Sequence, residues 1–170
     1  MKEYVVDFEG DGFHPTKIHV VSVQEGDKVF STPDKDKVKS LLEKECYIIG
    51  HNFKHFDMPH LKRLTGANPK CTVIDTLALS WYLEPTRQKH GLEEWGEFFG
   101  YPKVVIKDWH GLPYETYKER CERDVHINKL LWEYLKKKLI ELYGTSGEAF
   151  KLIAYLMFKM DCVALAEANM

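Results

Sequence analysis

Apolar residues recur along the chain in short runs that predict five strands. These runs occupy residues 5–9, 16–24, 29–30, 46–50 and 71–74. Some alternate between apolar and polar side chains and others are apolar throughout, which are the patterns of half-buried and fully buried strands. A turn-forming sequence, Glu-Gly-Asp-Lys, separates the second run from the third, so the first three strands should form an antiparallel meander. The fourth strand is expected to lie parallel to the first.

Apolar residues three or four positions apart predict helices between and after these strands. The expected helices span 33–44, 58–65, 75–84, 90–99, 114–138 and 148–169. The last helix is apolar nearly all round and therefore needs burial on more than one side. We accordingly divide the chain into a domain at 1–140 and a C-terminal helical segment at 141–170. That segment is the start of a polymerase region, an element that packs on a partner, or the completion of this domain's own core.

Two acidic residues lie on one face of the first strand. Val6 and Phe8 point to one side of that strand. Asp7 and Glu9 point to the other side, because alternate side chains share a face. Carboxylates at this spacing are about 7 Å apart and repel each other. A divalent cation such as Mg²⁺ or Mn²⁺ would relieve the repulsion, since hard ions prefer carboxylate oxygens. The alternative is that both acids lie at the solvent end of an edge strand.

Two further acidic residues occupy comparable positions. Asp57 comes shortly after the strand at 46–50, where it either faces the same sheet edge or caps the helix at 58–65. Asp124 falls on the inward, mostly apolar stripe of the helix at 114–138. An unpaired charge on that stripe would be costly, so Asp124 requires either an arginine partner or a metal ion shared with the first strand.

These four acidic residues converge if the strands at 5–9 and 46–50 are neighbours. Their ends would then meet at one edge of the sheet, and Asp124 would close the site from the helix. Four carboxylates can hold two divalent ions, Mg²⁺ or Mn²⁺, about 4 Å apart, the arrangement used for phosphodiester cleavage. The pattern therefore predicts a two-metal nuclease site formed by Asp7, Glu9, Asp57 and Asp124.

Composition narrows the choice of partner and compartment. The 170 residues suffice for one domain with a core, and the formal net charge of −2 excludes a nucleic-acid binder held by bulk positive charge. The four cysteines form no Cys-x-x-Cys pair, which favours free thiols in a reducing cytoplasm over a disulfide framework or a zinc site. No apolar run approaches the ~20 residues that cross a bilayer, so no membrane association is expected.

Several segments match motifs of one enzyme family. In chain order they are VVDFE at 5–9, IGHN at 49–52, FDMPHL at 56–61, IDTLALS at 74–80, HGLEEWG at 90–96 and CERDV at 121–125. With them the chain resembles the DEDD (DnaQ-like) superfamily of 3′→5′ exonucleases, which has a ribonuclease-H-like fold. More narrowly, it is similar to the N-terminal proofreading domain of family A DNA polymerases from short-tailed phages.

The resemblance implies an α/β fold with a mixed five-stranded sheet, the antiparallel meander plus the parallel strands, flanked by helices. It also implies that the four acidic residues are the ligands of two divalent cations. The side chains that it places against the substrate are Phe8, Phe13, His51, Asn52 and Phe56. Of these, Asn52 would contact the strand near the scissile phosphate, and Phe8 or Phe13 would contact the terminal base.

One position departs from the family pattern. The family has a tyrosine four residues before the last aspartate, where it orients the attacking water, and this chain has Arg120 there. A histidine subclass has its base five residues before, where this chain has Glu119 on the opposite side of the helix. Tyr117 is on the correct face but about 10 Å back along the axis. We expect metal-activated water, with Arg120 either binding a phosphate or only neutralising the acidic residues.

The sequence therefore predicts a metal-dependent 3′→5′ exonuclease that releases nucleotides from DNA 3′ ends during proofreading, with a polymerase domain or subunit as partner. One alternative is a freestanding exonuclease that acts on RNA or short oligonucleotides. Another is a weakly active module that binds nucleic acid or a polymerase, which the Arg120 departure would explain. The expected setting is the cytoplasm of a bacterial or phage-infected cell.

Overall fold

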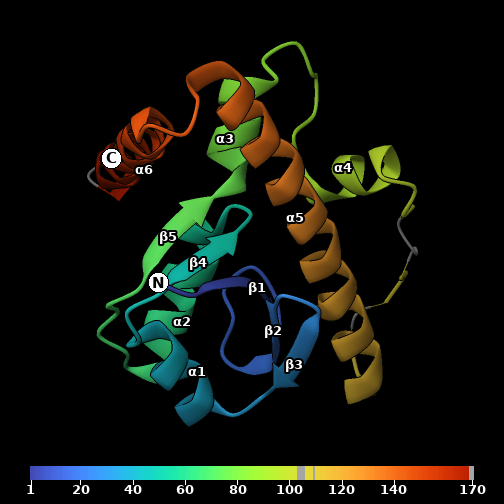
Figure 1. Cartoon of the computed structure of the whole chain (residues 1–170). Helices are drawn as coiled ribbons and strands as arrows, with labels where there is room; N and C mark the ends of the chain where they lie inside the picture. Colours follow the sequence, from blue (N-terminus) through green and yellow to red (C-terminus); the bar gives the residue numbers. More distant parts are fainter. Residues whose placement is uncertain (103–105, 109, 169–170) are drawn as a thin grey trace.

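A single mixed sheet organises the protein. The structure, a computed structural model, describes residues 1–102, 106–108 and 110–168. Within these ranges five strands pair in the order β3–β2–β1–β4–β5 (Figure 1). They are β1 (Glu3–Gly10), β2 (Ile18–Glu25), β3 (Lys28–Thr32), β4 (Tyr47–Gly50) and β5 (Thr72–Asp75). β1 lies at the centre, antiparallel to β2 and parallel to β4, as predicted.

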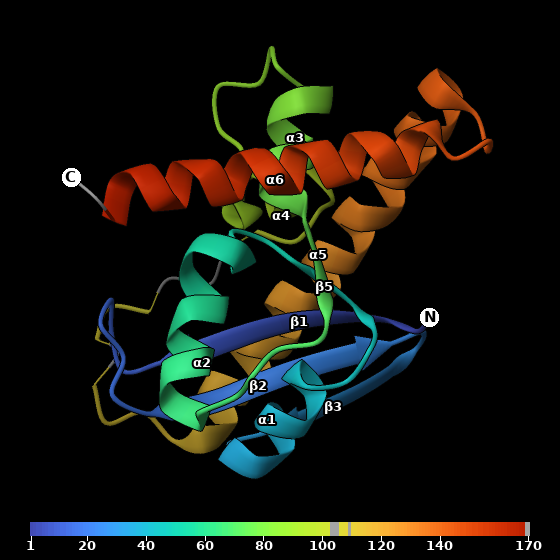
Figure 2. The same ribbon diagram turned by 90° about the vertical axis from the view of Figure 1, so that its left-hand side faces the viewer.

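Helices cover both faces of this sheet. They are α1 (Lys35–Leu42), α2 (Met58–Thr65), α3 (Thr76–Leu83), α4 (Leu92–Phe98), α5 (Tyr114–Tyr143) and α6 (Glu148–Ala168), and a π-helical turn, η1 (Phe53–Asp57), precedes α2. α1 and α2 lie on one face, and α5 crosses the other (Figure 2). The predicted ribonuclease-H-like arrangement, a mixed five-stranded sheet flanked by helices, is confirmed.

The alternation of side chains along β1 separates two hydrophobic cores. Val6 and Phe8 pack in the core beneath α1 and α2. Val5 packs in the second core, to which α3, α4, α5 and α6 contribute. Asp7 and Glu9 share the face of Val5, because every second residue of a strand points the same way. The two acids of the first strand therefore lie on the side of the sheet that α5 covers.

Two helices differ from the prediction, one at the predicted site and one at the far end of α5. The π-helical turn leads directly into α2, so Asp57 has helical backbone angles and its side chain makes no capping hydrogen bond. The interpretation of Asp57 as a helix cap is therefore wrong. α5 continues past residue 138 to Tyr143, because its apolar stripe extends to Leu139, which is buried in the second core.

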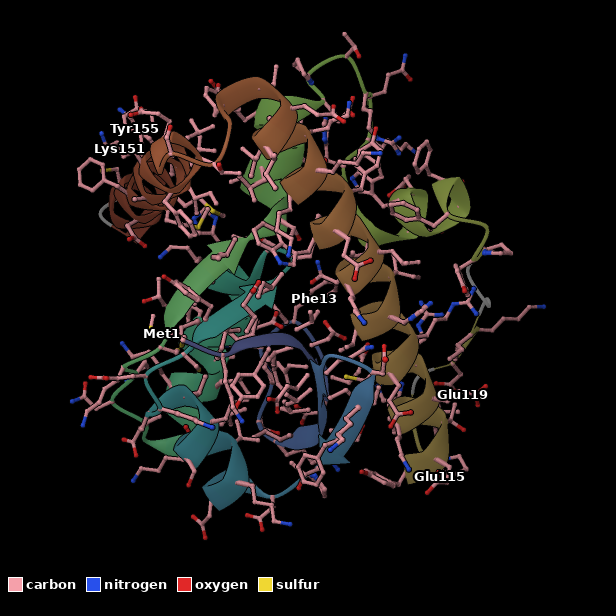
Figure 3. All side chains as sticks on the ribbon, viewed as in Figure 1. Met1, Phe13, Glu115, Glu119, Lys151 and Tyr155 are labelled. Atoms are coloured by element: carbon pink, nitrogen blue, oxygen red, sulfur yellow. The ribbon has the colours of Figure 1, made fainter. Side chains whose placement is uncertain are left out.

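α6 completes the second core with one of its faces. Ile153 and Met157 are buried there, beside β5 and α3. Tyr155 and Phe158 are exposed away from this buried stripe, and Figure 3 shows Tyr155 pointing away from the body of the protein, whereas the exposed Phe150 borders the buried stripe. The helix thus belongs to this domain's own core, one of the three roles expected for it. A domain boundary near residue 140 and a partner for the outer face stay predictions.

Parts of two predicted segments fall outside the described residues. They are residue 169 of the last helix, and residues 103–105 and 109 of the connection between α4 and α5. In the part of the chain that the structure describes, no helix has both the length and the apolar character needed to cross a bilayer.

Candidate metal centre

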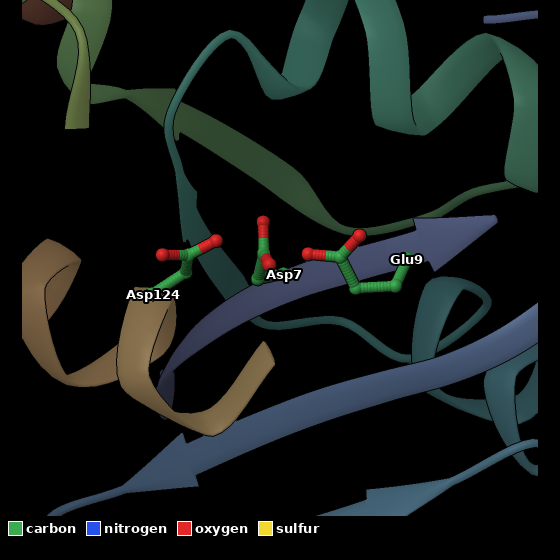
Figure 4. Close-up of side chains that lie close together, drawn as sticks. All are labelled: Asp7, Glu9 and Asp124. Carbon is green, nitrogen blue, oxygen red and sulfur yellow. The ribbon is translucent and has the colours of Figure 1, made fainter. Parts of the chain in front are cut away.

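Three carboxylates meet where β1 passes α5. Asp7 and Glu9 come from β1 and Asp124 comes from α5, and each offers a carboxylate oxygen within 4.8 Å of the other two. Figure 4 shows the three side chains directed into one space between the strand and the helix. All three are half-buried. The structure therefore brings together three of the four predicted acidic residues, from segments far apart in the sequence.

A cysteine holds the helix against the strand at this point. Cys121, nearly one helical turn before Asp124, is fully buried against β1. Its Sγ lies 3.3 Å from the backbone carbonyl oxygen of Asp7 and 3.4 Å from the carboxylate Oδ2 of the same residue. Burial raises the pKa of the Cys121 thiol, so it keeps its proton and acts as a weak donor. This contact fixes the separation between Asp7 and the helix that carries Asp124.

Burial and mutual repulsion make the three carboxylates hard to ionise together. Burial, followed by the charge of Asp124, raises the pKa of Glu9 to about 7. Burial also raises the pKa of Asp7 well above its ordinary range, and the charges of Asp124, Asp57 and Glu9 raise it further. A divalent cation would offset this repulsion. Three carboxylates at this spacing are a donor set that Mg²⁺ and Mn²⁺ accept, so the residues present fit such an ion.

Asp57 lies beside this group of three and is not one of its members. The side chain of Asp57 is only 5% exposed, at the end of η1. Burial raises its pKa, and the charges of Asp75, Glu9 and Asp124 raise it further, so its carboxylate lies within electrostatic reach of theirs. The predicted site of four carboxylates is thus a group of three with a fourth, buried carboxylate next to it.

Asp75 is a buried carboxylate near the site that the motif analysis gave no role. It ends β5 and caps α3, where it accepts a hydrogen bond from the backbone N–H of Leu77 at 3.0 Å. The same carboxylate accepts hydrogen bonds from the backbone N–H groups of Asn52 at 2.9 Å and Lys54 at 3.0 Å. In the sequence, the Asp-Thr pair at the end of a predicted strand indicates that Asp75 caps the following helix. It does not indicate that Asp75 also contacts the backbone of residues 52–54.

His51 belongs to a polar network inside the protein. Its Nε2 lies 2.7 Å from the carbonyl oxygen of His90, and its Nδ1 lies 2.8 Å from the hydroxyl of Thr76. Burial lowers the pKa of His51 to about 4, so the ring is neutral at pH 7. Because a carbonyl only accepts, Nε2 carries the proton, and the single hydroxyl hydrogen of Thr76 is shared between Nδ1 and the carbonyl oxygen of Gly50 at 3.1 Å. Both ring nitrogens are occupied, so this geometry does not favour the predicted substrate contact of His51.

A cavity of about 600 Å³ adjoins Glu9. It is lined by Phe8, Glu9, residues 10–13, Lys17, His19, Phe56, His110, Gly111 and Tyr117. Phe13 is 88% exposed, whereas Phe8 is buried in the first core with its ring centroid 6.5 Å from that of Phe56. Of the two phenylalanines predicted to contact the terminal base, Phe13 is the one whose ring is accessible. Asn52, also predicted to contact substrate, is half-buried.

One wall of this cavity could not be found from the sequence pattern. The pairing of β1 with β2 shifts between Glu9 and Gly10, and this shift leaves His19 without a partner residue in the ladder. A β-bulge of this kind redirects a side chain. The ring of His19 stacks on Tyr117 of α5, with centroids 4.1 Å apart and planes 5° apart. Hydrophobic alternation does not reveal this bulge, because Ile18 and Val20 are both buried and apolar although they pack in different cores.

Arg120 lies close to the three carboxylates. It lines a cavity of about 150 Å³ together with Asp124. Its charge opposes the rise in the pKa of Glu9 that burial and Asp124 cause. Glu119 is exposed on the side of α5 that faces away from the sheet, as predicted (Figure 3). The departure from the family pattern therefore puts a guanidinium, and not a base, next to the carboxylates.

Comparison with known proteins identifies the architecture. No protein-family model and no curated protein matches the chain. Brucella melitensis NrnC with bound Mg²⁺ is similar over all of this chain and 89% of its own, with a TM-score of 0.72 and 21% identity. NrnC bound to pGG gives a TM-score of 0.72 at 19% identity, over all of this chain and 88% of its own.

Two other nucleases are similar at lower scores. Escherichia coli RNase D, an exoribonuclease involved in structured RNA processing, has a TM-score of 0.64 and 15% identity over 94% of this chain and 45% of its own. Exonuclease X in complex with 5′ overhanging duplex DNA has a TM-score of 0.57 and 16% identity over 89% of this chain and 98% of its own. The chain has the fold of the DEDD-type 3′–5′ exonucleases.

The DEDD-type fold agrees with the broader of the two resemblances found in the sequence. Identities of 15–22% show the fold alone, so activity has to be argued from the site. The narrower likeness to phage polymerase proofreading domains rests on the sequence motifs only.

Proposed function

We propose that this protein is a metal-dependent 3′→5′ exonuclease that hydrolyses phosphodiester bonds at the 3′ ends of nucleic acid strands. The observation that carries the proposal is the spacing of Asp7, Glu9 and Asp124, whose mutual repulsion raises the pKa of Asp7 and of Glu9 and would be offset by divalent cations. The DEDD-type fold supports it. The adjoining cavity of about 600 Å³ would give a terminal nucleotide access to the carboxylates.

The chain's own residues divide the work between holding the cations and holding the substrate. Asp7, Glu9 and Asp124 would supply most of the cation ligands, with Asp57 as the fourth. Bound cations of this kind supply an activated water and stabilise the leaving oxygen. The guanidinium of Arg120 would bind a phosphate oxygen beside them, because it is planar and always charged.

A strand labelled at its 5′ end tests the proposed function. With Mg²⁺ or Mn²⁺ the protein should shorten the strand one nucleotide at a time from the 3′ end, and with EDTA it should leave the strand intact. Release of internal fragments, or equal activity in EDTA, would contradict the proposal. A wild-type protein that binds no Mn²⁺ in a calorimetric titration would instead favour the weakly active binding module.

Two candidate substrates remain within this function. The sequence motifs favour DNA 3′ ends, a polymerase partner and the cytoplasm of a bacterial or phage-infected cell. The likeness to NrnC bound to pGG and to RNase D supports a freestanding exonuclease on RNA or short oligonucleotides at least as well. Proofreading requires faster cleavage of mismatched than of matched DNA 3′ ends. A freestanding oligonucleotide exonuclease requires the shortest strands to be cleaved fastest. Side-by-side digestion of DNA and RNA strands of the same sequence shows which of the two it prefers.

Arg120→Ala should lower kcat by about tenfold to a hundredfold, because a guanidinium aimed at a phosphate stabilises the charge that develops during hydrolysis. The activity should also need a higher pH, since Arg120 opposes the rise in the pKa of Glu9 that burial and Asp124 cause. Steady-state kinetics across pH 6–9 measure both effects. Arg123→Ala is the matched control, because this arginine lines the same cavity while its guanidinium donates to the backbone carbonyl of Pro102. An unchanged kcat with a shifted pH profile in Arg120→Ala would leave Arg120 with charge neutralisation alone, and no change in either would give it no role.

A further inference from the structure

The turn that carries Asp57 has an unusual backbone. Asn52, just before it, is the described non-glycine residue with a positive φ, 56°, and η1 itself is a single π-helical turn. Such conformations cost free energy and persist only where surrounding contacts hold them. The position of the Asp57 carboxylate therefore depends on whatever holds η1 in place.

Asp75 contacts this turn from the inside. Its Oδ1 accepts hydrogen bonds from the N–H groups of Asn52 and Leu77, and its Oδ2 accepts one from Lys54. Asp75 itself is fully buried. Hydrogen bonds from backbone N–H groups to a carboxylate are roughly twice as strong as neutral ones, and no water competes for them here. One side chain thus joins the start of α3 to both ends of the segment 52–54.

α6 contacts the same turn from the outside. The Nζ of Lys54 lies 3.0 Å from Oδ1 of Asp161, and Nε2 of His55 lies 2.9 Å from the carbonyl oxygen of Met160. The Lys54–Asp161 pair is partly exposed, with the Asp161 side chain 59% accessible, so it contributes less than the buried contacts of Asp75. Asp75 is therefore the buried support of η1, because it accepts from one N–H group just before the turn and from one within it, and α6 adds the contact to His55.

We propose that Asp75 is a positioning residue: it holds the backbone of residues 52–54 so that Asp57 can join Asp7, Glu9 and Asp124 as a cation ligand. The inference rests on the proposed function, because it gives Asp57 a role in cation binding. It assigns Asp75 no contact with substrate or cation. Residues that orient the ligands of a metal ion without touching the ion typically contribute about tenfold to a hundredfold to metal affinity, and we expect an effect of this size from Asp75.

Asp75→Asn tests this role with a defined change. An asparagine can keep the Oδ1 bonds to Asn52 and Leu77, but its amide then faces the N–H of Lys54, donor against donor. In a calorimetric titration with Mn²⁺ alone, we expect the weaker of the two ions to bind at least tenfold less tightly than in wild type. Unchanged or tighter binding would overturn the proposal, and tighter binding would show that Asp75 acts mainly by repelling Asp57.

Asp34→Asn is the matched control. Asp34 is also a helix-capping aspartate, accepting from the N–H groups of Asp36 at 2.8 Å and Lys37 at 3.5 Å, but it caps α1 on the opposite face of the sheet. Because asparagine caps a helix about as well as aspartate, Asp34→Asn should measurably change neither thermal stability nor Mn²⁺ binding. Equal losses of Mn²⁺ affinity in both variants would show that the loss is not specific to Asp75, which contradicts a positioning role.

Amide hydrogen exchange of the wild-type protein keeps the test independent of how well any variant folds. The N–H groups of Asn52 and Lys54 should exchange slowly, with protection close to that of the core strands, because Asp75 accepts both. Exchange as fast as at the chain ends would overturn the proposal. Wild type that binds no Mn²⁺ at all would refute the proposed function instead, so the two failures are distinguishable.

Discussion

Replacing Asp7 with asparagine should reduce nucleotide release from 3′ ends by about a thousandfold or more. Asp7 is the central member of the three-carboxylate group, and the charges of Asp124, Asp57 and Glu9 all raise its pKa beyond the effect of burial. An amide of the same shape keeps the packing against Cys121 but removes the negative charge that a cation needs. Single-turnover assays with Mg²⁺ in excess measure the chemical step directly.

Two controls separate this loss from misfolding. Asp7→Asn should retain or raise the melting temperature of the metal-free protein, since it removes a buried charge. Glu119→Gln changes a carboxylate on the outer side of the same helix and should leave activity at the wild-type level. Activity within threefold of wild type in Asp7→Asn would remove this carboxylate from the site and, with it, the main support for nuclease chemistry.

Glu9→Gln should raise the free energy of unfolding of the metal-free protein at pH 8 by about 2 kcal/mol. Burial and Asp124 raise the pKa of Glu9 from 4.5 to about 7 in the folded state. Between these two pH values the unfolded chain has lost the proton that the folded protein still holds, so stability falls as pH rises through this window. Above it the full cost of the folded-state charge is present, and a glutamine removes that cost.

Urea unfolding at pH 5 and pH 8 measures this effect. The gain from Glu9→Gln should shrink at pH 5, where folded Glu9 is already protonated. Adding Mg²⁺ at pH 8 should stabilise wild type more than the variant, because only wild type keeps all the ligands. A control at the exposed Glu119, changed to Gln, should show neither dependence. Equal stability of wild type and Glu9→Gln at pH 8 would contradict the strained, cation-dependent site described above.

The sequence predicted a residue's position correctly where that position followed from the two-residue repeat of a strand or the 3.6-residue repeat of a helix. Asp7 and Glu9 share a strand face by alternation, and Asp124 shares a helix stripe by the 3.6-residue repeat. Those two rules account for the three acids that lie together, whereas the parallel pairing of β1 with β4, from which the convergence of Asp57 was expected, leaves Asp57 beside the group. The core positions of β1 and α5 followed from the same periodicities.

The rest of the site depends on backbone irregularities that no period describes. The π-helical turn at η1 puts Asp57 in a buried position beside the group of three, where its side chain caps no helix. The bulge in β2 turned His19 onto Tyr117. The triple acceptor role of Asp75 joins segments more than twenty residues apart, and a single sequence carries no trace of that pairing. Irregular backbone of this kind concentrates at functional sites, where local rules fail most often.

The contacts from α6 to η1 also have a consequence for when activity begins. The carbonyl of Met160 that contacts His55 lies 105 residues further along the chain, so a ribosome makes it after all four site carboxylates. A nascent chain that stops before α6 lacks the outer support of the Asp57 turn, as well as the Ile153 and Met157 side chains that fill the second core. We therefore expect nuclease activity to begin only after α6 has left the ribosome and docked against η1.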